Sequence, residues 1–242
     1  MMKKMLVLCV CVVMVLFAAT AFGAEIKTMN LIPERYALLM MADAEPDQPL
    51  DKKKILELVN AECKKLDVAQ LQWVIYDKGK KRGDGVRAYG EKRKNKNVEV
   101  AEYIECAGKH AVLEGKWAEN FIGYQSSPKE LYNAYSDNEV VADEDFKGKP
   151  ILLQIKVPKV AKDPFGKPYI QVAADKTGMF GVHIYLDSKD PFLRKIKRGS
   201  QIFVRGVARG FVMQSVVLDG IIISDGKSIL VDGKVLTEGM VQ

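Results

Sequence analysis

The stretch SDNEVVADEDFKGKPILLQIKV, from Ser136 to Val157, changes abruptly from acidic residues to aliphatic ones. Its first half is typical of a solvated helix face, and residues 151–157 are typical of a buried strand. Gly148 lies at the change, because glycine permits a backbone turn that other residues avoid. The stretch therefore predicts a helix that leads directly into the first strand of a β-rich domain.

The lead-in is expected to begin at the sequence SPKE, residues 127–130. Serine caps a helix, proline is favoured at the first helical position, and Glu130 can reach back to the amide of the capping residue. Asp137 or Asn138 is expected to interrupt this helix and to cap its continuation. We therefore expect two short helices before the first strand.

The rest of the C-terminal half has the alternation and composition of strands. The predicted elements are strands at 151–157, 169–173, 182–186, 202–208 and 216–223, with a short helix at 192–197 between the third and fourth strands. This is the element order of an OB-fold, a five-stranded Greek-key barrel. We expect an α+β, mostly β protein in which the barrel and its lead-in occupy residues 126–226 and fold independently, followed by a hairpin-like tail at 227–242.

The N-terminal region, residues 24–125, is expected to join one helix to a small antiparallel meander. Its predicted elements are an irregular segment at 25–50, a helix at 52–66 capped by Asp51, strands at 71–76, 86–90 and 98–106, and basic turns at 78–85 and 92–97. Residues 111–117 and 121–124 are further strand candidates that would close the meander. A helix over 99–113 is the alternative for part of this region.

The first residues have the pattern of a secretory signal peptide. Lys3 and Lys4 precede an unbroken apolar run at 5–17, and small residues follow. The run is short for a membrane span, and the small residues suit cleavage after Ala21 or Gly23. We expect residues 1–23 to be removed and the protein to be periplasmic or secreted. An uncleaved leader is the alternative, and it would be the only membrane contact.

The amino-acid composition limits the functions that the protein can have. The formal net charge of +6 falls to +4 without Lys3 and Lys4, which is mild for a nucleic-acid-binding protein. With two histidines and no catalytic triad, acid pair or metal-ligand set, we expect no enzyme, no metal and no cofactor. Cys63 and Cys106 remain after the leader and can form a disulfide in an oxidising compartment. Two buried free thiols are the alternative.

Two motifs of the C-terminal half resemble a known family. The first is N-E-x-x-A-D-x-x-F-K-G-K, carried by Asn138, Glu139, Ala142, Asp143, Phe146, Lys147, Gly148 and Lys149. The second is L-x-x-(I/L)-K-x-G-x-x-(V/I), carried by Leu193, Ile196, Lys197, Gly199 and Ile202. Residues 130–224 resemble the secreted OB-fold family tRNA_anti-like (tRNA-anticodon-like). The resemblance implies an OB barrel with a helical lead-in, and it implies nucleic-acid binding by fold analogy alone.

Side chains alternate between the two faces of a strand, so the predicted strands have an interior and an exterior set. The interior set is apolar: Ile170, Val172, Val182, Ile184, Leu186, Ile202 and Val204. The exterior set, here called the aromatic face, is Tyr169, Gln171, His183, Tyr185, Phe203 and Arg205. OB-folds bind oligonucleotides and oligosaccharides on this face, where aromatic rings stack on the ligand. Packing against the N-terminal region is the alternative role for these aromatics.

A second candidate surface is basic. Lysines and arginines crowd the two predicted turns and the strand between them, and the candidate contacts are Lys80, Lys81, Arg82, Arg87, Arg93 and Lys94. If both turns project the same way, they form one positive surface that attracts nucleic acid, anionic lipid or acidic polysaccharide. Solvated loops without a partner are the alternative.

The sequence thus favours an exported, non-enzymatic OB-fold binding module that engages a polymer or a protein through the aromatic face. The partner would be an envelope protein, or a saccharide or polyanionic polymer. The first alternative is an envelope structural or protein-interaction protein whose N-terminal region covers this face. The second is nucleic-acid binding through the OB-fold and the basic loops. Burial of Tyr185 and Phe203 against residues 50–125 would favour the first alternative.

Overall fold

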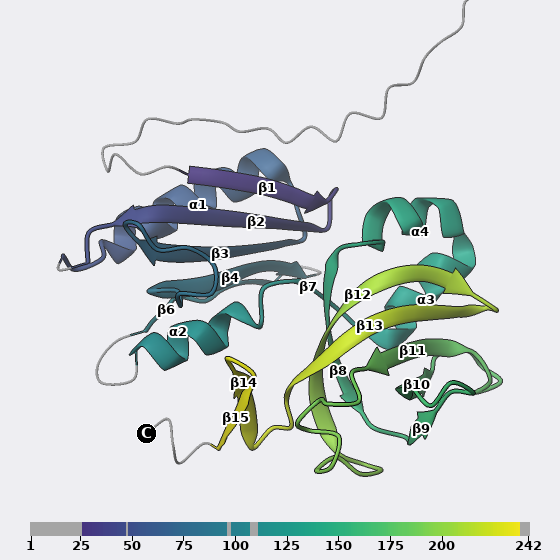
Figure 1. Cartoon of the computed structure of the whole chain (residues 1–242). Coiled ribbons are helices and arrows are strands. Elements are labelled where there is room, and N and C mark those ends of the chain that lie inside the picture. The colour runs from purple at the N-terminus through teal and green to yellow at the C-terminus, as the bar shows by residue number, and fades with distance from the viewer. Residues whose placement is uncertain (1–25, 47, 96–97, 107–110, 238–242) are drawn as a thin grey trace, which may run out of the picture.

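The computed structural model describes residues 26–46, 48–95, 98–106 and 111–237, which form two adjacent β-rich halves (Figure 1). The expected signal peptide lies outside the described residues. Within them, no helix is long and apolar enough to cross a membrane.

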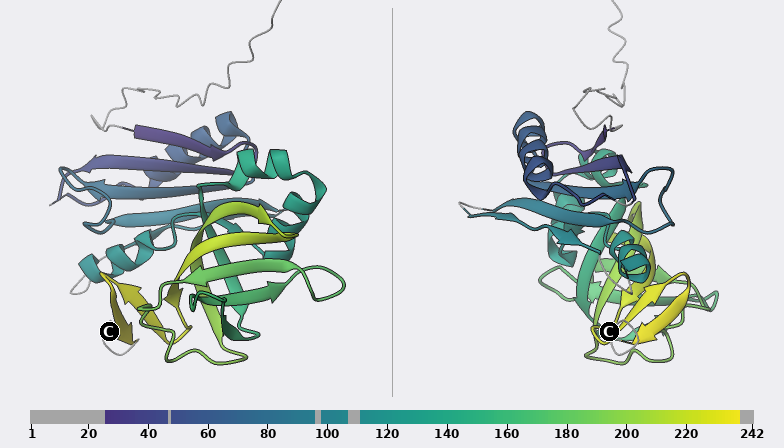
Figure 2. Two further views of the ribbon diagram at one scale, coloured as in Figure 1. Left: turned by 45° about the vertical axis from the view of Figure 1, so that its right-hand side comes forward. Right: turned by 90° about the vertical axis from the view of Figure 1, so that its left-hand side faces the viewer.

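The N-terminal half is a sheet with the strand order β1-β2-β3-β4-β5, to which the short β6 adds by pairing with β4. Its elements are β1 (Ile26–Ile32), β2 (Tyr36–Ala44), α1 (Lys52–Leu66), β3 (Gln70–Asp77), β4 (Ala88–Asn95), β5 (Val98–Ala101) and β6 (Ile104–Glu105). β2 and β3 are parallel because α1 carries the chain back between them, and the other pairs are antiparallel. α1 covers one face of this sheet (Figure 2).

The predicted helix at 52–66 is confirmed, including its cap: the amide of Lys54 donates to Asp51 Oδ1 at 3.1 Å. The strand predicted at 71–76 is confirmed as β3. The irregular segment expected at 25–50 is wrong for its first part, because β1 and β2 form a hairpin there. Pro33 lies in the tight turn of this hairpin, where Glu34 has a φ of 58°.

Two further expectations for this half are wrong. The basic turn at 92–97 begins as strand, because β4 runs on through Asn95. Residues 111–117 form helix α2 (Ala111–Glu119) in place of a strand. Gly115, a weak helix former, lies so close to the segment before β4 that a Cβ there would be 2.2 Å from the carbonyl oxygen of Val86. Close packing therefore favours a helix that local propensity does not predict.

The C-terminal half is the predicted barrel. Its strands are β8 (Pro150–Lys156), β9 (Val160–Lys162), β10 (Pro168–Ala173), β11 (Gly181–Leu186), β12 (Gln201–Val212) and β13 (Ser215–Ser224). They follow the order β8-β12-β13-β11-β10-β9, in which β11 and β13 are parallel and the other pairs antiparallel. β8 and β9 follow each other in the chain as two parts of one interrupted strand. The strand order therefore begins and ends with parts of the same strand. This is the topology of an OB-fold.

Two helices lead into the barrel as predicted. α3 (Pro128–Asp137) is capped by Ser127, and α4 (Glu139–Phe146) is capped by Asn138. The Glu130 carboxylate does not close the expected capping box, since it accepts a hydrogen bond from the Tyr124 hydroxyl at 2.7 Å. The helix expected at 192–197 is wrong: these residues form turns in which the amide of Ile196 donates to the carbonyl of Phe192 at 3.0 Å.

A strand pair and a docked hairpin connect the two halves. The short strand β7 (Tyr124–Ser126) pairs in parallel with β8. The hairpin of β14 (Ser228–Val231) and β15 (Lys234–Thr237) extends from β13 and lies beside α2 (Figure 1). There, Lys116 Nζ is 2.7 Å from Asp232 Oδ2, and Asn120 donates to the carbonyl of Leu230 at 2.6 Å.

The main hydrophobic core crosses the expected boundary near residue 125. It includes Tyr36, Val74 and Tyr76 from the N-terminal sheet together with barrel residues such as Ile151 and Ile184. A second, smaller core lies between α1 and the opposite face of the sheet. Independent folding of residues 126–226 therefore stays a prediction, and the shared core weighs against it.

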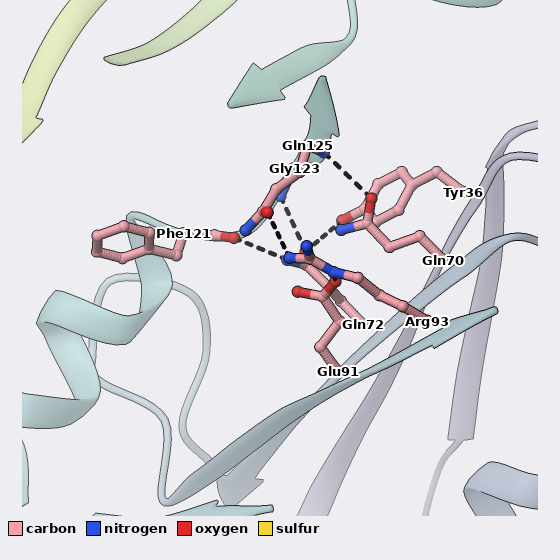
Figure 3. Close-up of polar contacts among 8 residues, drawn as sticks. All are labelled: Tyr36, Gln70, Gln72, Glu91, Arg93, Phe121, Gly123 and Gln125. Carbon is pink, nitrogen blue, oxygen red and sulfur yellow. Dashed lines mark hydrogen bonds and ion pairs between the residues drawn. The ribbon is translucent and has the colours of Figure 1, made fainter. Parts of the chain in front are cut away.

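Buried glutamines fasten the N-terminal sheet to the segment that enters the barrel (Figure 3). Gln72 Oε1 accepts hydrogen bonds from the Tyr36 hydroxyl at 2.8 Å and from the amide of Gly123 at 3.0 Å. Gln72 Nε2 donates to the carbonyl oxygen of Phe121 at 2.9 Å. One side chain thus satisfies three polar groups at the junction of the two halves.

The same row continues along the sheet (Figure 3). The amide of Gln125 donates to Gln70 Oε1 at 3.1 Å, while Arg93 donates to Gln125 Oε1 and pairs with Glu91. We call the eight residues the polar seam: Tyr36, Gln70, Gln72, Glu91, Arg93, Phe121, Gly123 and Gln125. Because strand alternation turns Gln70 and Gln72 toward the barrel, the seam fixes residues 121–125 against the sheet.

Replacing Gln72 with leucine should destabilise the protein strongly. The change keeps an apolar body of similar size but leaves a buried hydroxyl, amide and carbonyl without their partner. Each buried unsatisfied group costs about 1–3 kcal/mol, so three such groups should lower the free energy of unfolding by at least about 3 kcal/mol. Denaturant unfolding measures it. The exposed Gln201→Leu is the matched control and should stay within about 0.5 kcal/mol. Equal effects of both changes would refute a fastening role for the seam.

Candidate functional site

The aromatic face is built on adjacent strands of the barrel. On β10 and β11, Tyr169 lies opposite Tyr185 and Gln171 opposite His183. All four side chains are half-buried, whereas Ile170 and Ile184 between them are fully buried in the core. Alternation along the strands therefore separates a packed interior from an outer surface of rings and polar groups.

The rings of this surface are in contact. The Tyr169 and Tyr185 rings stack with centroids 5.6 Å apart and planes at 29°, and the His183 ring lies 5.6 Å from Tyr169. Lys167 Nζ lies 5.2 Å from the centroid of the Tyr185 ring, in a cation–π contact. The tyrosine pair is thus held in a defined geometry, while part of its surface stays accessible.

A charged cluster borders the tyrosine pair. Asp219 on β13 lies opposite Tyr185 and accepts a fork of hydrogen bonds from Arg209 on β12. Lys167 Nζ is 3.3 Å from the same carboxylate. Partial burial alone would raise the pKa of Asp219, but Arg209 and Lys167 together lower it below its ordinary value. Sequence reasoning missed this cluster, although Asp219 is the one acid within the apolar strand 216–223.

The other two predicted members lie elsewhere. Phe203 on β12 meets the Phe121 ring edge-on at 5.7 Å, and Phe121 in turn meets Trp117 at 5.0 Å. Arg205, two residues further along β12, is half-buried opposite the buried Leu152. The aromatic face is therefore divided. The N-terminal half covers Phe203, while the ring contacts of Tyr185 are with Tyr169 and Lys167, both in the barrel.

The predicted basic surface is broken up by local contacts. Arg87 binds Asp77 at 3.1 Å and the carbonyl oxygens of Glu45 and Gln48, and Arg93 belongs to the polar seam. Lys80, Lys81 and Arg82 are exposed, and the side chain of Lys94 lies outside the described residues.

The turn at 78–85 is itself fixed to α2. Glu119, which is buried, accepts hydrogen bonds from the amides of Gly83 at 2.8 Å and Gly85 at 3.2 Å. Glu119 therefore attaches the turn to α2. Of the predicted basic surface, this turn retains three exposed cations, Lys80, Lys81 and Arg82.

Cys63 and Cys106 are free thiols in the structure. Cys63 packs with α1 on one face of the N-terminal sheet, whereas Cys106 is buried in the core on the other face. Burial raises the pKa of the Cys106 thiol to about 12, so it stays protonated at neutral pH. The structure therefore has two free thiols in place of a disulfide.

Among the described residues, no group of three His, Cys, Asp or Glu side chains is placed to hold a metal ion.

A protein-family model, tRNA_anti-like, matches residues 1–221. The chain belongs to the tRNA_anti-like family. No curated protein and no solved structure matches it. The predicted resemblance is thus confirmed, and the match extends well beyond residues 130–224 into the N-terminal half.

The first tRNA_anti-like motif forms the hinge between helix and barrel. Asn138 Oδ1 caps α4 by accepting from the amide of Val141 at 3.2 Å, and Phe146 is buried in the core. Gly148 has a φ of 75°, and its amide donates to the carbonyl of Ala208 on β12 at 2.9 Å. Lys147 pairs with Asp143 one turn earlier. The motif therefore has an architectural role, and it contributes no side chain to the aromatic face.

His183 should titrate below its ordinary pKa. Burial among the rings penalises the charged imidazolium, and its Nε2 atom is buried without a hydrogen-bond partner. NMR titration should place its midpoint below the value of about 6.5 that an unperturbed histidine shows. The same chain unfolded in urea provides the reference. A midpoint at or above the unfolded one would contradict the packing described here.

The lowered pKa has a consequence for stability. Because the folded chain binds the proton less readily than the unfolded chain, acid favours unfolding. The free energy of unfolding should fall as the pH drops from about 6.5 towards the folded pKa of His183. The variant His183→Gln lacks this contribution and should show a smaller decline over that window.

Proposed function

We propose that the protein is an exported, non-enzymatic OB-fold module that binds a saccharide polymer on the open half of its aromatic face. The observation that carries the proposal is the stacked pair of Tyr169 and Tyr185, which is partly exposed beside His183. Sugar and base rings stack on such a surface, and OB-folds bind oligosaccharides and oligonucleotides there.

The charges around the tyrosine pair favour a neutral ligand. Arg209 and Lys167 share the single carboxylate of Asp219, so this cluster has a net charge of only +1. A polyanion would need free cations along its path, since counterion release supplies much of its affinity. Hydroxyl groups of a saccharide, in contrast, can share hydrogen bonds with charged and amide groups while the ring stacks on tyrosine.

Export and the lack of catalysis are parts of the same proposal. The charged and apolar pattern of residues 1–23 supports export. The family is one of binding folds, and no triad, acid pair or metal set is evident in the sequence. The polymer would then belong to the cell envelope or the extracellular space.

A protein partner is the second candidate. It is favoured by the contact of Phe203 with Phe121, because part of the ligand face is already used for packing between the halves. An envelope structural protein needs no open ligand groove, and its partner would then contact the remaining exposed surface.

Replacing Tyr169 and Tyr185 together with alanine should strongly weaken saccharide binding. Stacking on one aromatic ring is worth about 1–3 kcal/mol, so the loss of two rings should weaken binding by about thirtyfold or more. Binding of soluble envelope oligosaccharides is measured by titration calorimetry. Tyr103→Ala, a half-buried tyrosine of the N-terminal half, is the matched control. Unfolding curves verify that all variants remain folded.

The salt dependence separates saccharide binding from nucleic-acid binding. Saccharide binding through stacking should change little with ionic strength, whereas single-stranded DNA or RNA binding should weaken steeply. Saccharide binding that the double variant leaves intact would refute the site. Binding of nucleic acid alone, with a steep salt dependence, would refute the saccharide proposal in favour of the fold analogy.

A further inference from the structure

A pocket of about 350 Å³ lies at the corner where β8 ends and β9 begins. Its lining consists of Pro158, Lys159, Val160, Ile196, Lys197 and Arg198. The turn at 197–200 is clamped to this corner by two backbone hydrogen bonds, from Gly199 N to Val157 O at 2.7 Å and from Val157 N to Ser200 O at 2.8 Å. The rim of the pocket is therefore fixed by the main chain.

Three cations line this pocket without a counter-ion. Lys159, Lys197 and Arg198 are exposed, and no acidic residue contributes to the lining. Within the described part of the chain, none of the three forms an ion pair with a carboxylate. Four more exposed cations belong to the same two segments: Lys156, Lys162, Arg194 and Lys195.

These charges have no evident structural use. The turn is held by backbone hydrogen bonds, and the nearby Asp190 is buried and accepts from the amides of Phe192 and Ile222. Like charges gathered around one depression repel each other, which opposes folding. An anionic ligand would remove this repulsion.

We propose that the pocket binds a phosphate monoester that carries an apolar group. A phosphate monoester has a charge of about −1.5 to −2 near pH 7 and three terminal oxygens. It therefore suits a site with three cations better than a carboxylate, which has a single charge and two oxygens. An arginine fork can take two of these oxygens, and the lysines act as point charges. Val160, Ile196 and Pro158 supply apolar surface for the body of the ligand.

The site is separate from the aromatic face, with which it shares no residue. Its chemistry fits a soluble phosphate ester and equally the phosphate at the head of a lipid. Failure of saccharide binding would not affect this site, and failure of phosphate binding would leave the aromatic face untouched.

The probe is hexyl phosphate, titrated into the intact chain by calorimetry, with hexyl sulfate and hexanoate as comparators. We expect hexyl phosphate to bind best and to lose affinity below about pH 6, where the dianion takes up a proton and becomes a monoanion. The triple variant Lys159→Gln/Lys197→Gln/Arg198→Gln should weaken binding by about tenfold or more. The control Lys80→Gln/Lys81→Gln/Arg82→Gln removes the same charge from another exposed turn and should leave the affinity nearly unchanged.

The source of the phosphate is tested with vesicles of phosphatidylcholine, with and without phosphatidic acid. Retention on the phosphatidic acid vesicles, lost in the triple variant, supports a lipid source. Binding of hexyl phosphate without vesicle retention supports a soluble ester. The single variant Lys197→Glu, at an exposed turn position, should also weaken either binding if the triple variant proves unstable. The proposal is overturned if neither probe binds, if hexyl sulfate or hexanoate binds equally well, or if both triple variants weaken binding equally.

Discussion

The arrangement of the two halves depends on the hydrogen bonds of the Gln72 side-chain amide. Gln72 lies on a central strand of the N-terminal sheet and joins a tyrosine of the neighbouring strand to the main chain of residues 121–123. Those residues are the entrance to the barrel, and Phe121 extends from them onto β12. By fixing this segment, the polar seam decides which part of the aromatic face is covered. A buried hydrogen-bond network of this kind specifies one docking arrangement, since a shifted one would leave its members unpaired.

The family motif and the candidate ligand surface lie in different parts of the molecule. Asn138, Phe146 and Gly148 cap, bury and turn the chain between helix and strand. Arg35 of the N-terminal half adds to this hinge, with its guanidinium carbon 5.4 Å from the centroid of the Phe146 ring. Membership of the tRNA_anti-like family therefore explains how the barrel begins. What the barrel binds depends on side chains outside the motif, such as Tyr169, Tyr185 and Asp219.

The sequence predicted the barrel well because strands such as β11 and β12 alternate between more and less buried side chains, and because Ser127 and Asn138 cap the lead-in helices through local hydrogen bonds. It failed where a distant contact decides the outcome. Pro33 marks a hairpin turn, and Gly115 lies in a helix that packs closely against the main chain of Val86. The division of the aromatic face was likewise hidden, since the contact of Phe203 with Phe121 joins residues far apart in the chain. The pocket beside Ile196 also depends on two segments that only the fold brings together.

The docking of the C-terminal hairpin on α2 has a consequence for how the protein matures. Lys116 and Asn120 of the N-terminal half find their partners in residues 230–232, which are synthesised after the whole barrel. During translation the first half thus emerges with part of its surface uncovered, and that surface stays uncovered while the barrel strands are made. A polypeptide built in this way cannot reach its final packing before residue 232 has been synthesised.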